Sequence, residues 1–284
     1  MKEITLYLNG RFMPYSEAKI GVEDRGYQFA DGVYEVIRVY DGRLFKMKEH
    51  MDRLETSARE IDIPLISRAE LTDVCTELIR RNNLKKSSIY IQVSRGVCPR
   101  NHSVPCDIEP TLVIIGRDND GPPAEYRKQG VKAITVPDDR WSRCYIKSTG
   151  LLPNILARRK AERAGAYEAV FIRDGFVTEC SSCNAFIVES GALVTPPLTN
   201  YILAGVTRGA IIEIAESLGI KVGEEPISLE RMARADEIWV TGTITEIMPA
   251  VNLDGTTIGD ARPGPVFSRV YAEYVASYTG GEIS

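Results

Sequence analysis

Lys147 lies in the stretch RCYIKSTGLLPN, where a short strand is expected to end and a helix with proline in its first turn to begin. A lysine amine is a good nucleophile only after it has lost its proton, and partial burial against apolar neighbours favours that form. The tyrosine and isoleucine just before Lys147 supply such neighbours. Lys147 is therefore a candidate nucleophile, although most lysines at strand ends are simply solvated.

Three short polar segments are suited to holding an anion. Glu179 precedes CSSCN, whose small polar residues can present backbone N–H groups and hydroxyls. GVT opens a predicted helix, where unsatisfied N–H groups and the positive end of the helix dipole point outward, and TGT is a third such loop. Each is also an ordinary turn or cap when taken singly. Together with a nucleophilic lysine and a carboxylate they indicate pyridoxal phosphate, which needs an amine, a partner for its ring nitrogen and an anion cradle.

The six cysteines are expected to be reduced thiols, because the chain is large and has no secretory signal. Cys180 and Cys183 form a C-x-x-C, which is compatible with a redox pair or with half of a zinc site. There is no second C-x-x-C, and the only histidines, His50 and His102, lie far away in sequence, so we expect no metal. The other cysteines are Cys75, Cys98, Cys106 and Cys144.

The composition is that of an ordinary globular protein, with 44% hydrophobic and 26% charged residues in a chain of 284. This length fits two domains at least as well as one. A net charge of -4 with dispersed Lys and Arg argues against nucleic acid as a partner, and no G-x-G-x-x-G or P-loop run supports a dinucleotide or nucleotide site. The N-terminus has no apolar signal core and no apolar run could span a bilayer, so we expect a cytoplasmic protein without membrane contact.

The first half of the chain has the pattern of an α+β domain. Alternating apolar and polar residues predict hairpins that turn at Asn9-Gly10 and Asp41-Gly42. Helical periodicity follows over 48–61 and 67–82, and SIYIQVSRG and PTLVIIGRD have strand character. The polar segment RDNDGPPAEY is the best linker candidate, so we expect a smaller N-terminal domain over residues 1–119.

Residues 120–284 are expected to form the larger domain. It begins with the strand VKAITVP and the lysine segment, enters a helix, and continues with hairpins that turn at Asp174-Gly175 and Ser190-Gly191. Thr207 is the expected N-cap of the next helix. DEIWVTGTITEIMPAV predicts a strand broken by Gly242, and PVFSRVYAEYVASY predicts a closing helix.

Seven motifs, in one order and at similar spacing, resemble those of fold-type IV pyridoxal-phosphate enzymes, most closely the bacterial D-amino acid transaminases. The resemblance covers nearly the whole chain. It implies a two-domain α+β fold, with a smaller N-terminal α/β domain and a larger C-terminal β-barrel-like domain with helices that carries the cofactor lysine, and it implies a homodimer. The motifs are GYQFADGVYEVIRVY, HMDRL, VSRGVCPRNHSVP, RCYIKSTGLLPN, YEAVFIRDGFVTECSSCN, ILAGVTR and TGTITEIMP.

Position by position, the resemblance makes Lys147 the Schiff-base lysine and Glu179 the carboxylate on the pyridine nitrogen, where it keeps the ring protonated and able to accept electrons. It implies packing against the ring from Leu203. ECSSCN departs from the family, which more often has glycine after the glutamate and serine or threonine before the asparagine, so Cys183 would offer phosphate a backbone N–H rather than a hydroxyl. The implied phosphate contacts are Arg53 of HMDRL, Ser182, Cys183, Asn184, Val206, Thr207, Gly242 and Thr243.

The stretch RNH distinguishes members within this family. In D-amino acid transaminases an arginine and a histidine at this spacing hold the substrate α-carboxylate with the tyrosine of GVYE, which implies Arg100, His102 and Tyr34 here. A planar guanidinium is well shaped for a carboxylate. A solvated loop arginine and histidine are the alternative.

The implied reaction moves an amino group from a D-amino acid, such as D-alanine or D-glutamate, to a 2-oxo acid through a pyridoxamine form. Branched-chain L-amino acid transaminase, R-selective amine transaminase and aminodeoxychorismate lyase share the scaffold. A thiol oxidoreductase that uses Cys180 and Cys183, and a non-catalytic cofactor carrier, stay open as alternatives.

Overall fold

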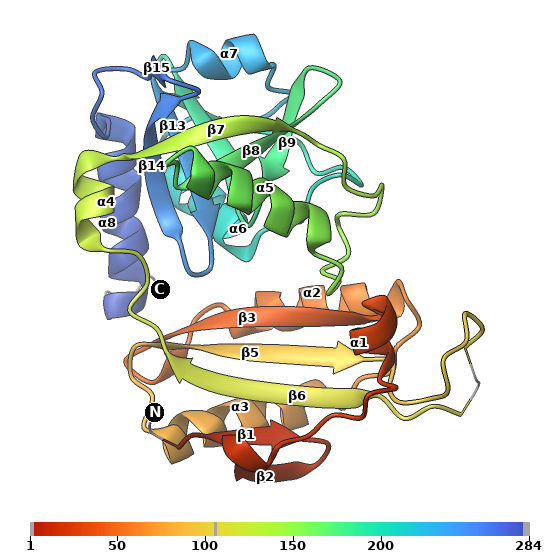
Figure 1. Cartoon of the computed structure of the whole chain (residues 1–284). Coiled ribbons are helices and arrows are strands. Elements are labelled where there is room, and N and C mark those ends of the chain that lie inside the picture. Colours follow the sequence, from red (N-terminus) through yellow and green to blue (C-terminus); the bar gives the residue numbers. More distant parts are fainter. Residues whose placement is uncertain (1–2, 105–106, 281–284) are drawn as a thin grey trace. The chain divides into compact units, whose positions relative to one another are not determined.

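The computed structural model describes residues 3–104 and 107–280, and the chain divides into two compact units (Figure 1). Unit 1 comprises the chain up to Asp120 together with Ile146–Leu151, and unit 2 comprises Gly121–Tyr145 together with the chain from Leu152 onward. The first division thus falls inside the polar segment RDNDGPPAEY. Cys106 lies outside the described residues.

Unit 1 is a six-stranded sheet in the order β2-β1-β6-β5-β3-β4, with all neighbours antiparallel. Helix α2 packs against β3, and α3 packs against β1 and β6, because each helix buries one apolar stripe. The strands are β1 (Thr5–Leu8), β2 (Arg11–Pro14), β3 (Gly32–Tyr40), β4 (Arg43–Leu44), β5 (Ser87–Ser94) and β6 (Thr111–Asp118), and the helices are η1 (Tyr15–Glu17), α1 (Arg25–Phe29), α2 (Met47–Arg59) and α3 (Arg68–Asn82).

The segment Ile146–Leu151 joins unit 1 by backbone pairing with β3. Val33 and Ser148 form a β-bridge, and the Tyr34 N–H donates to the Lys147 carbonyl at 3.0 Å. The expectation that residues 120–284 form one domain that carries Lys147 is corrected for this segment, which belongs with unit 1 by its contacts. Pairing between parts of the chain so far apart leaves no local signal in the sequence.

Unit 2 is a mixed nine-stranded sheet in the order β12-β11-β10-β13-β14-β7-β8-β9, with β15 beside β14. The Cys180 N–H at the end of β9 donates to the Cys183 carbonyl just before β10 at 2.7 Å, so the sheet curls back on itself, as expected for a barrel-like domain. The strands are β7 (Val131–Pro137), β8 (Glu168–Arg173), β9 (Phe176–Cys180), β10 (Asn184–Glu189), β11 (Ala192–Thr195), β12 (Val222–Glu224), β13 (Glu237–Gly242), β14 (Glu246–Leu253) and β15 (Thr256–Thr257).

Helices lie against this sheet, with α5 beside β7 and β8 and α6 beside β13 and α8 (Figure 1). The core of the unit is formed by apolar side chains such as Ile187, Ile238 and Met248, all at most 1% exposed. The α+β fold expected from the sequence is confirmed. The helices are α4 (Ala124–Gln129), α5 (Leu152–Arg163), α6 (Val206–Ser217), α7 (Leu229–Ala233) and α8 (Pro265–Thr279).

The four expected hairpins are present, and each turns through two residues with positive φ. That conformation matches the right-handed twist of paired strands, and it is why an Asn-Gly, Asp-Gly or Ser-Gly pair is a strong local signal. The pairs are Asn9 and Gly10 (φ 45° and 85°), Asp41 and Gly42 (47° and 77°), Asp174 and Gly175 (51° and 82°), and Ser190 and Gly191 (51° and 81°).

Two local expectations in unit 2 are corrected. The N-cap of α6 is Gly205, and Thr207 lies buried in the first turn. A side chain at Gly205 would place its Cβ 1.9 Å from Asn184 Oδ1, so the start of this helix lies tight against β10. The break at Gly242 is a hairpin turn, because β13 pairs antiparallel with β14 on its far side.

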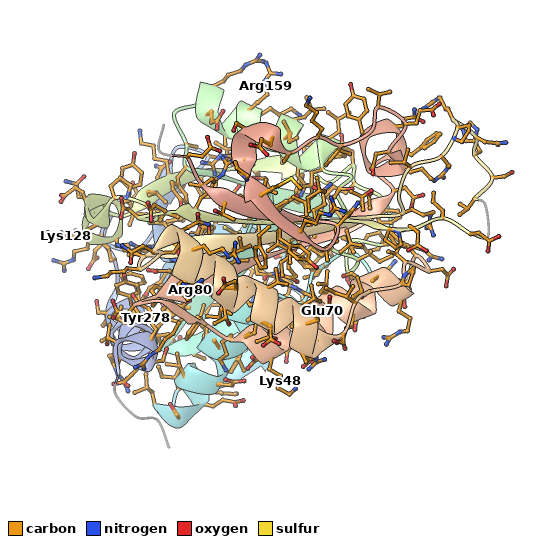
Figure 2. All side chains as sticks on the ribbon, turned by 90° about the horizontal axis from the view of Figure 1, so that it is seen from below. Lys48, Glu70, Arg80, Lys128, Arg159 and Tyr278 are labelled. Carbon is orange, nitrogen blue, oxygen red and sulfur yellow. The ribbon has the colours of Figure 1, made fainter. Side chains whose placement is uncertain are left out.

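Charged side chains cover the outer surface of both units. Lys48 on α2 and Glu70 and Arg80 on α3 are exposed examples (Figure 2). Among the described helices, none combines the length and apolar character needed to cross a membrane.

Candidate active site

Lys147 is fixed by its backbone on two sides in unit 1. Its N–H donates to Ser57 Oγ on α2 at 3.0 Å, and its carbonyl accepts from the Tyr34 N–H on β3 at 3.0 Å. The side chain extends over the Tyr34 ring, with Nζ 4.3 Å from the ring centroid. A lysine held at its backbone with its amine over an aromatic face is well placed to react with a carbonyl group.

A buried ionic cluster lies close to this lysine in unit 1. Glu35, next to Tyr34 on β3, is fully buried and accepts from Arg53 Nε at 2.7 Å and Nη2 at 2.9 Å. His50 Nδ1 lies 2.8 Å from the same carboxylate. Burial acts to raise the pKa of Glu35, but the Arg53 charge and the hydrogen bonds from His50 and Arg53 hold that pKa well below its usual range. Burial, together with the charges of Arg53 and Lys147, lowers the pKa of His50.

The expected carboxylate-binding residues divide into two groups within unit 1. Tyr34 lies beside Lys147, and its ring also contacts Tyr90 at 5.8 Å between centroids. Arg100 and His102 are exposed and lie on Phe29, with Arg100 Cζ 4.4 Å and the His102 ring 5.6 Å from the centroid of its ring. The loop that carries RNH thus presents a guanidinium and an imidazole on one aromatic platform.

Glu179 is the centre of a buried polar network in unit 2. Its carboxylate accepts from Arg140 Nη1, from the Leu203 N–H at 3.1 Å and from Asn184 Nδ2 at 3.3 Å. Asn184 Nδ2 also donates to the Leu203 carbonyl at 3.0 Å. The structure therefore brings together Glu179, Asn184 and Leu203, three residues that the sequence singles out separately.

Arg140 joins Glu179 to Asp138. It donates to Asp138 Oδ1 through Nε at 2.9 Å and to Oδ2 through Nη2 at 2.9 Å, while Thr178 Oγ1 donates to Oδ2 at 2.8 Å. Burial acts to raise the pKa of Asp138, but the Arg140 guanidinium outweighs it and lowers that pKa to about 2. These contacts keep the Asp138 carboxylate ionised in the interior.

Three backbone segments of unit 2 could receive an anion. The α6 N-terminus, with Val206 and Thr207 in its first turn, has no side-chain cap among the described contacts, so its N–H groups are suited to a ligand. A Cβ at Gly242 would lie 3.3 Å from the Ser182 carbonyl and 3.4 Å from Cys183 Sγ, so the end of β13 lies against the CSSC loop. Thr243 follows in the turn between β13 and β14.

Comparison with known proteins gives this arrangement a family. The family described as Amino-transferase class IV matches residues 32–253. The chain belongs to the class IV aminotransferases. A D-alanine aminotransferase of Bacillus licheniformis is 42% identical over 263 residues, which cover 92% of this chain and 93% of that protein.

Solved structures of branched-chain aminotransferases superimpose along nearly the whole chain. The branched-chain amino acid aminotransferase of Escherichia coli has a TM-score of 0.93 at 31% identity and covers 98% of this chain and 96% of its own. A second branched-chain enzyme, from T.th. and solved with pyridoxamine 5'-phosphate, has a TM-score of 0.91 at 28% identity over 99% and 95%. The fold-type IV architecture expected from the motifs is confirmed.

The C-x-x-C of this aminotransferase is buried and unreactive in character. Cys180 and Cys183 are free thiols, at 1% and 6% exposed. Burial and the nearby Glu168 carboxylate raise the pKa of both thiols well above its usual range. A redox thiol needs a low pKa and access, so these cysteines do not have the setting of a thiol oxidoreductase. Among the described residues there is also no group of three or more side chains suited to a metal.

Sequence reasoning missed several residues of the site. Arg140 and Asp138 come from PDDR, at the end of β7, where a run of charges at a strand end is the only available signal. Glu35 looks like a polar residue on an alternating strand. Glu168 was also missed, and it is fully buried and accepts from Ser181 Oγ and from Ser182 Oγ, the latter at 2.9 Å.

Proposed function

We propose that this class IV aminotransferase is a pyridoxal-phosphate-dependent enzyme that transfers the amino group of a D-amino acid to a 2-oxo acid. The observation that carries the proposal is the setting of Lys147, whose backbone is held by Ser57 and Tyr34 and whose amine lies over the Tyr34 ring. The kinship with proteins named D-alanine aminotransferase at 42% identity supports the D-specific form.

The residues present fit the cofactor. Pyridoxal phosphate requires an amine for its carbonyl carbon, an anionic partner for its protonated ring nitrogen and N–H donors for its phosphate. Lys147 is a fixed amine, and Glu179 is a buried carboxylate with an arginine behind it. Gly205 and Gly242 leave little room for side chains where the backbone comes close to Asn184 and the CSSC loop. When bound, the cofactor supplies an electrophilic carbon and an electron sink.

We assign the following roles to the side chains. Lys147 would hold the cofactor through its Nζ and, once displaced by the substrate amine, that Nζ would take the proton from the substrate α-carbon and return it to the cofactor carbon. Glu179 would keep the ring nitrogen protonated, and Leu203 would pack against the ring. The phosphate would be held by Arg53 and by the residues Ser182, Cys183, Asn184, Val206, Thr207, Gly242 and Thr243.

Tyr34, Arg100 and His102 would bind the substrate α-carboxylate. The exposed guanidinium of Arg100 is matched to a carboxylate in shape and charge. A carboxylate fixed on one side leaves only one enantiomer with its α-hydrogen toward Lys147, which would give D-selectivity. L-specific branched-chain transamination on the same scaffold is the second candidate, favoured by the solved structures that superimpose on this chain.

We also propose that the enzyme is a homodimer. Val22 and Tyr27 of unit 1 are 79% and 80% exposed, and association between copies would remove such large apolar side chains from water. Its cytoplasmic location stays a prediction.

Borohydride reduction of the purified protein tests the role of Lys147. We expect the cofactor to be fixed covalently to a peptide that contains Lys147, and we expect Lys147→Ala to lose formation of pyruvate from D-alanine and 2-oxoglutarate. Lys160→Ala, an exposed lysine of α5, is the matched control. Recovery of the label on another lysine would overturn the assignment.

A further inference from the structure

The turn between β13 and β14 has an unusual exit. Gly242 pairs with Glu246 across it, so residues 243–245 form a three-residue loop. Glu246 has a φ of 58°, in the left-handed region that non-glycine residues rarely adopt. Such a residue persists only where its surroundings hold it in place.

Arg127 supplies that hold. It lies on α4, in the segment that the sequence marks only as a linker, and its Nη2 donates to the Thr245 carbonyl at 3.0 Å and lies 2.9 Å from Glu246 Oε2. The side chains of Arg127 and Glu246 are only 12% and 6% exposed, so the ion pair is weakly screened. One nitrogen thus bridges the backbone of the turn and the carboxylate at its exit.

Helix α8 adds a second contact to the same pair. Tyr271 Oη donates to Glu246 Oε2 at 3.3 Å, and the Arg127 guanidinium lies 5.3 Å from the centroid of the Tyr271 ring. Burial, with the Glu246 charge as a further cause, raises the pKa of Tyr271, so its hydroxyl stays protonated and available as a donor. α4 lies alongside α8 in Figure 1.

The hydroxyl of Thr245 is held from the other side of the turn. It lies 3.2 Å from Tyr167 Oη and accepts from Cys183 Sγ at 3.5 Å. Gly242, at the start of the turn, lies against Ser182 and Cys183. The turn is therefore fixed at its start, at its last residue and at its exit, and its backbone lies against the CSSC loop.

We propose that Arg127 is a positioning residue for the cofactor phosphate. By fixing Thr245 and Glu246 it would hold the backbone N–H groups of the turn, at Gly242 and Thr243, in the geometry that receives the phosphate, so that the turn need not be ordered on binding. Arg127 itself would not contact the cofactor. This inference rests on the proposed function, which makes Gly242 and Thr243 phosphate ligands.

The test compares two ligands that differ only in the phosphate. Dissociation constants for pyridoxal phosphate and for pyridoxal are measured on cofactor-free full-length protein, for the wild type and for Arg127→Met. Lys128→Ala, an exposed cation on the same helix (Figure 2), is the matched control. We expect Arg127→Met to weaken pyridoxal phosphate binding about tenfold, the scale of one charge-assisted hydrogen bond, with little change for pyridoxal and none in the control.

Equal losses for both ligands, or no loss for either, would overturn the proposal, because a merely structural residue does not distinguish a phosphate. If Arg127→Met fails to fold by circular dichroism, Arg127→Lys decides. It keeps a cation near Glu246 but lacks the reach and planarity of the guanidinium, so we expect a smaller loss that is again confined to pyridoxal phosphate. An unchanged preference for the phosphate in Arg127→Lys would overturn the proposal. A wild type that does not prefer pyridoxal phosphate over pyridoxal would instead refute the proposed function itself.

Discussion

The Arg140 guanidinium donates a hydrogen bond to the Glu179 carboxylate, and both side chains are buried in unit 2. Arg140 holds Asp138 at the same time, so a single cation connects two interior carboxylates. Such a network fixes the position of Glu179 and leaves it ionised beside whatever cation it receives. A buried partner removed from this network would leave Arg140 with an incomplete set of acceptors.

Glu179→Gln should therefore keep its shape but lose its chemistry. We expect the variant to bind pyridoxal phosphate and to remove the substrate α-proton about ten- to a hundred-fold more slowly, because a neutral amide cannot hold a proton on the ring nitrogen. Single-turnover rates with α-protonated and α-deuterated D-alanine measure this step. Glu189→Gln, at the ion pair with Arg231, is the matched control, and an unchanged rate in Glu179→Gln would contradict the role.

Asp138 should contribute stability that disappears in acid. Its pKa is lowered from 3.8 to about 2 in the folded protein, so the contribution is fully present above about pH 4 and is lost as the pH falls through 2. The expected loss of unfolding free energy is about 2 kcal/mol over that range. Urea unfolding at several pH values should show this slope in the wild type and in Asp174→Asn, an exposed turn residue, and a flatter profile in Asp138→Asn. Identical slopes in all three proteins would refute the account of Asp138.

The cysteine pair should be dispensable for the reaction. Both thiols are buried with raised pKa values, so they are not expected to react. Cys180→Ser and Cys183→Ser should keep transamination, with at most weaker cofactor retention in Cys183→Ser, since Cys183 donates to Thr245. Loss of activity together with a redox-dependent signal in the wild type would favour the thiol oxidoreductase.

Arg100→Ala should separate carboxylate recognition from catalysis. Loss of a charge-assisted contact should lower the rate with amino acids by about ten- to a hundred-fold and leave a primary amine without a carboxylate almost unaffected. Arg159→Ala, an exposed arginine on α5 (Figure 2), serves as the control. Parallel losses for the amine and the amino acid would show that Arg100 does not bind the carboxylate.

The parts of this fold that the sequence predicts are those with local causes. Asn9-Gly10 and Asp174-Gly175 dictate hairpins because both residues of each turn adopt positive φ. The periodicity places helix α3 to within a residue, and Ser67 caps it, accepting from the Glu70 N–H at 3.2 Å. Thr207 has the sequence signature of a cap, but a hydroxyl before a helical pattern cannot reveal that Gly205 lies against Asn184.

The sequence predicts the reacting groups of the site and not their supports. Lys147 and Glu179 stand out by residue type and motif, whereas Arg140, Glu35 and Arg127 are ordinary charged residues until folding buries them beside a partner. The pairing of Lys147 with β3 likewise depends on a contact between distant parts of the chain. Nothing in the local sequence encodes such partners, so only the structure assigns them.

A half-reaction with paired enantiomers tests the central claim most directly. The purified holoenzyme is mixed with the D- or L-form of alanine, glutamate or leucine, without a 2-oxo acid, and conversion of the cofactor to its pyridoxamine form is followed by absorbance. The account predicts rapid conversion by D-alanine and D-glutamate and much slower conversion by the L-enantiomers. If L-glutamate or L-leucine converts the cofactor faster than any D-amino acid, the D-specific assignment is wrong and the branched-chain alternative replaces it.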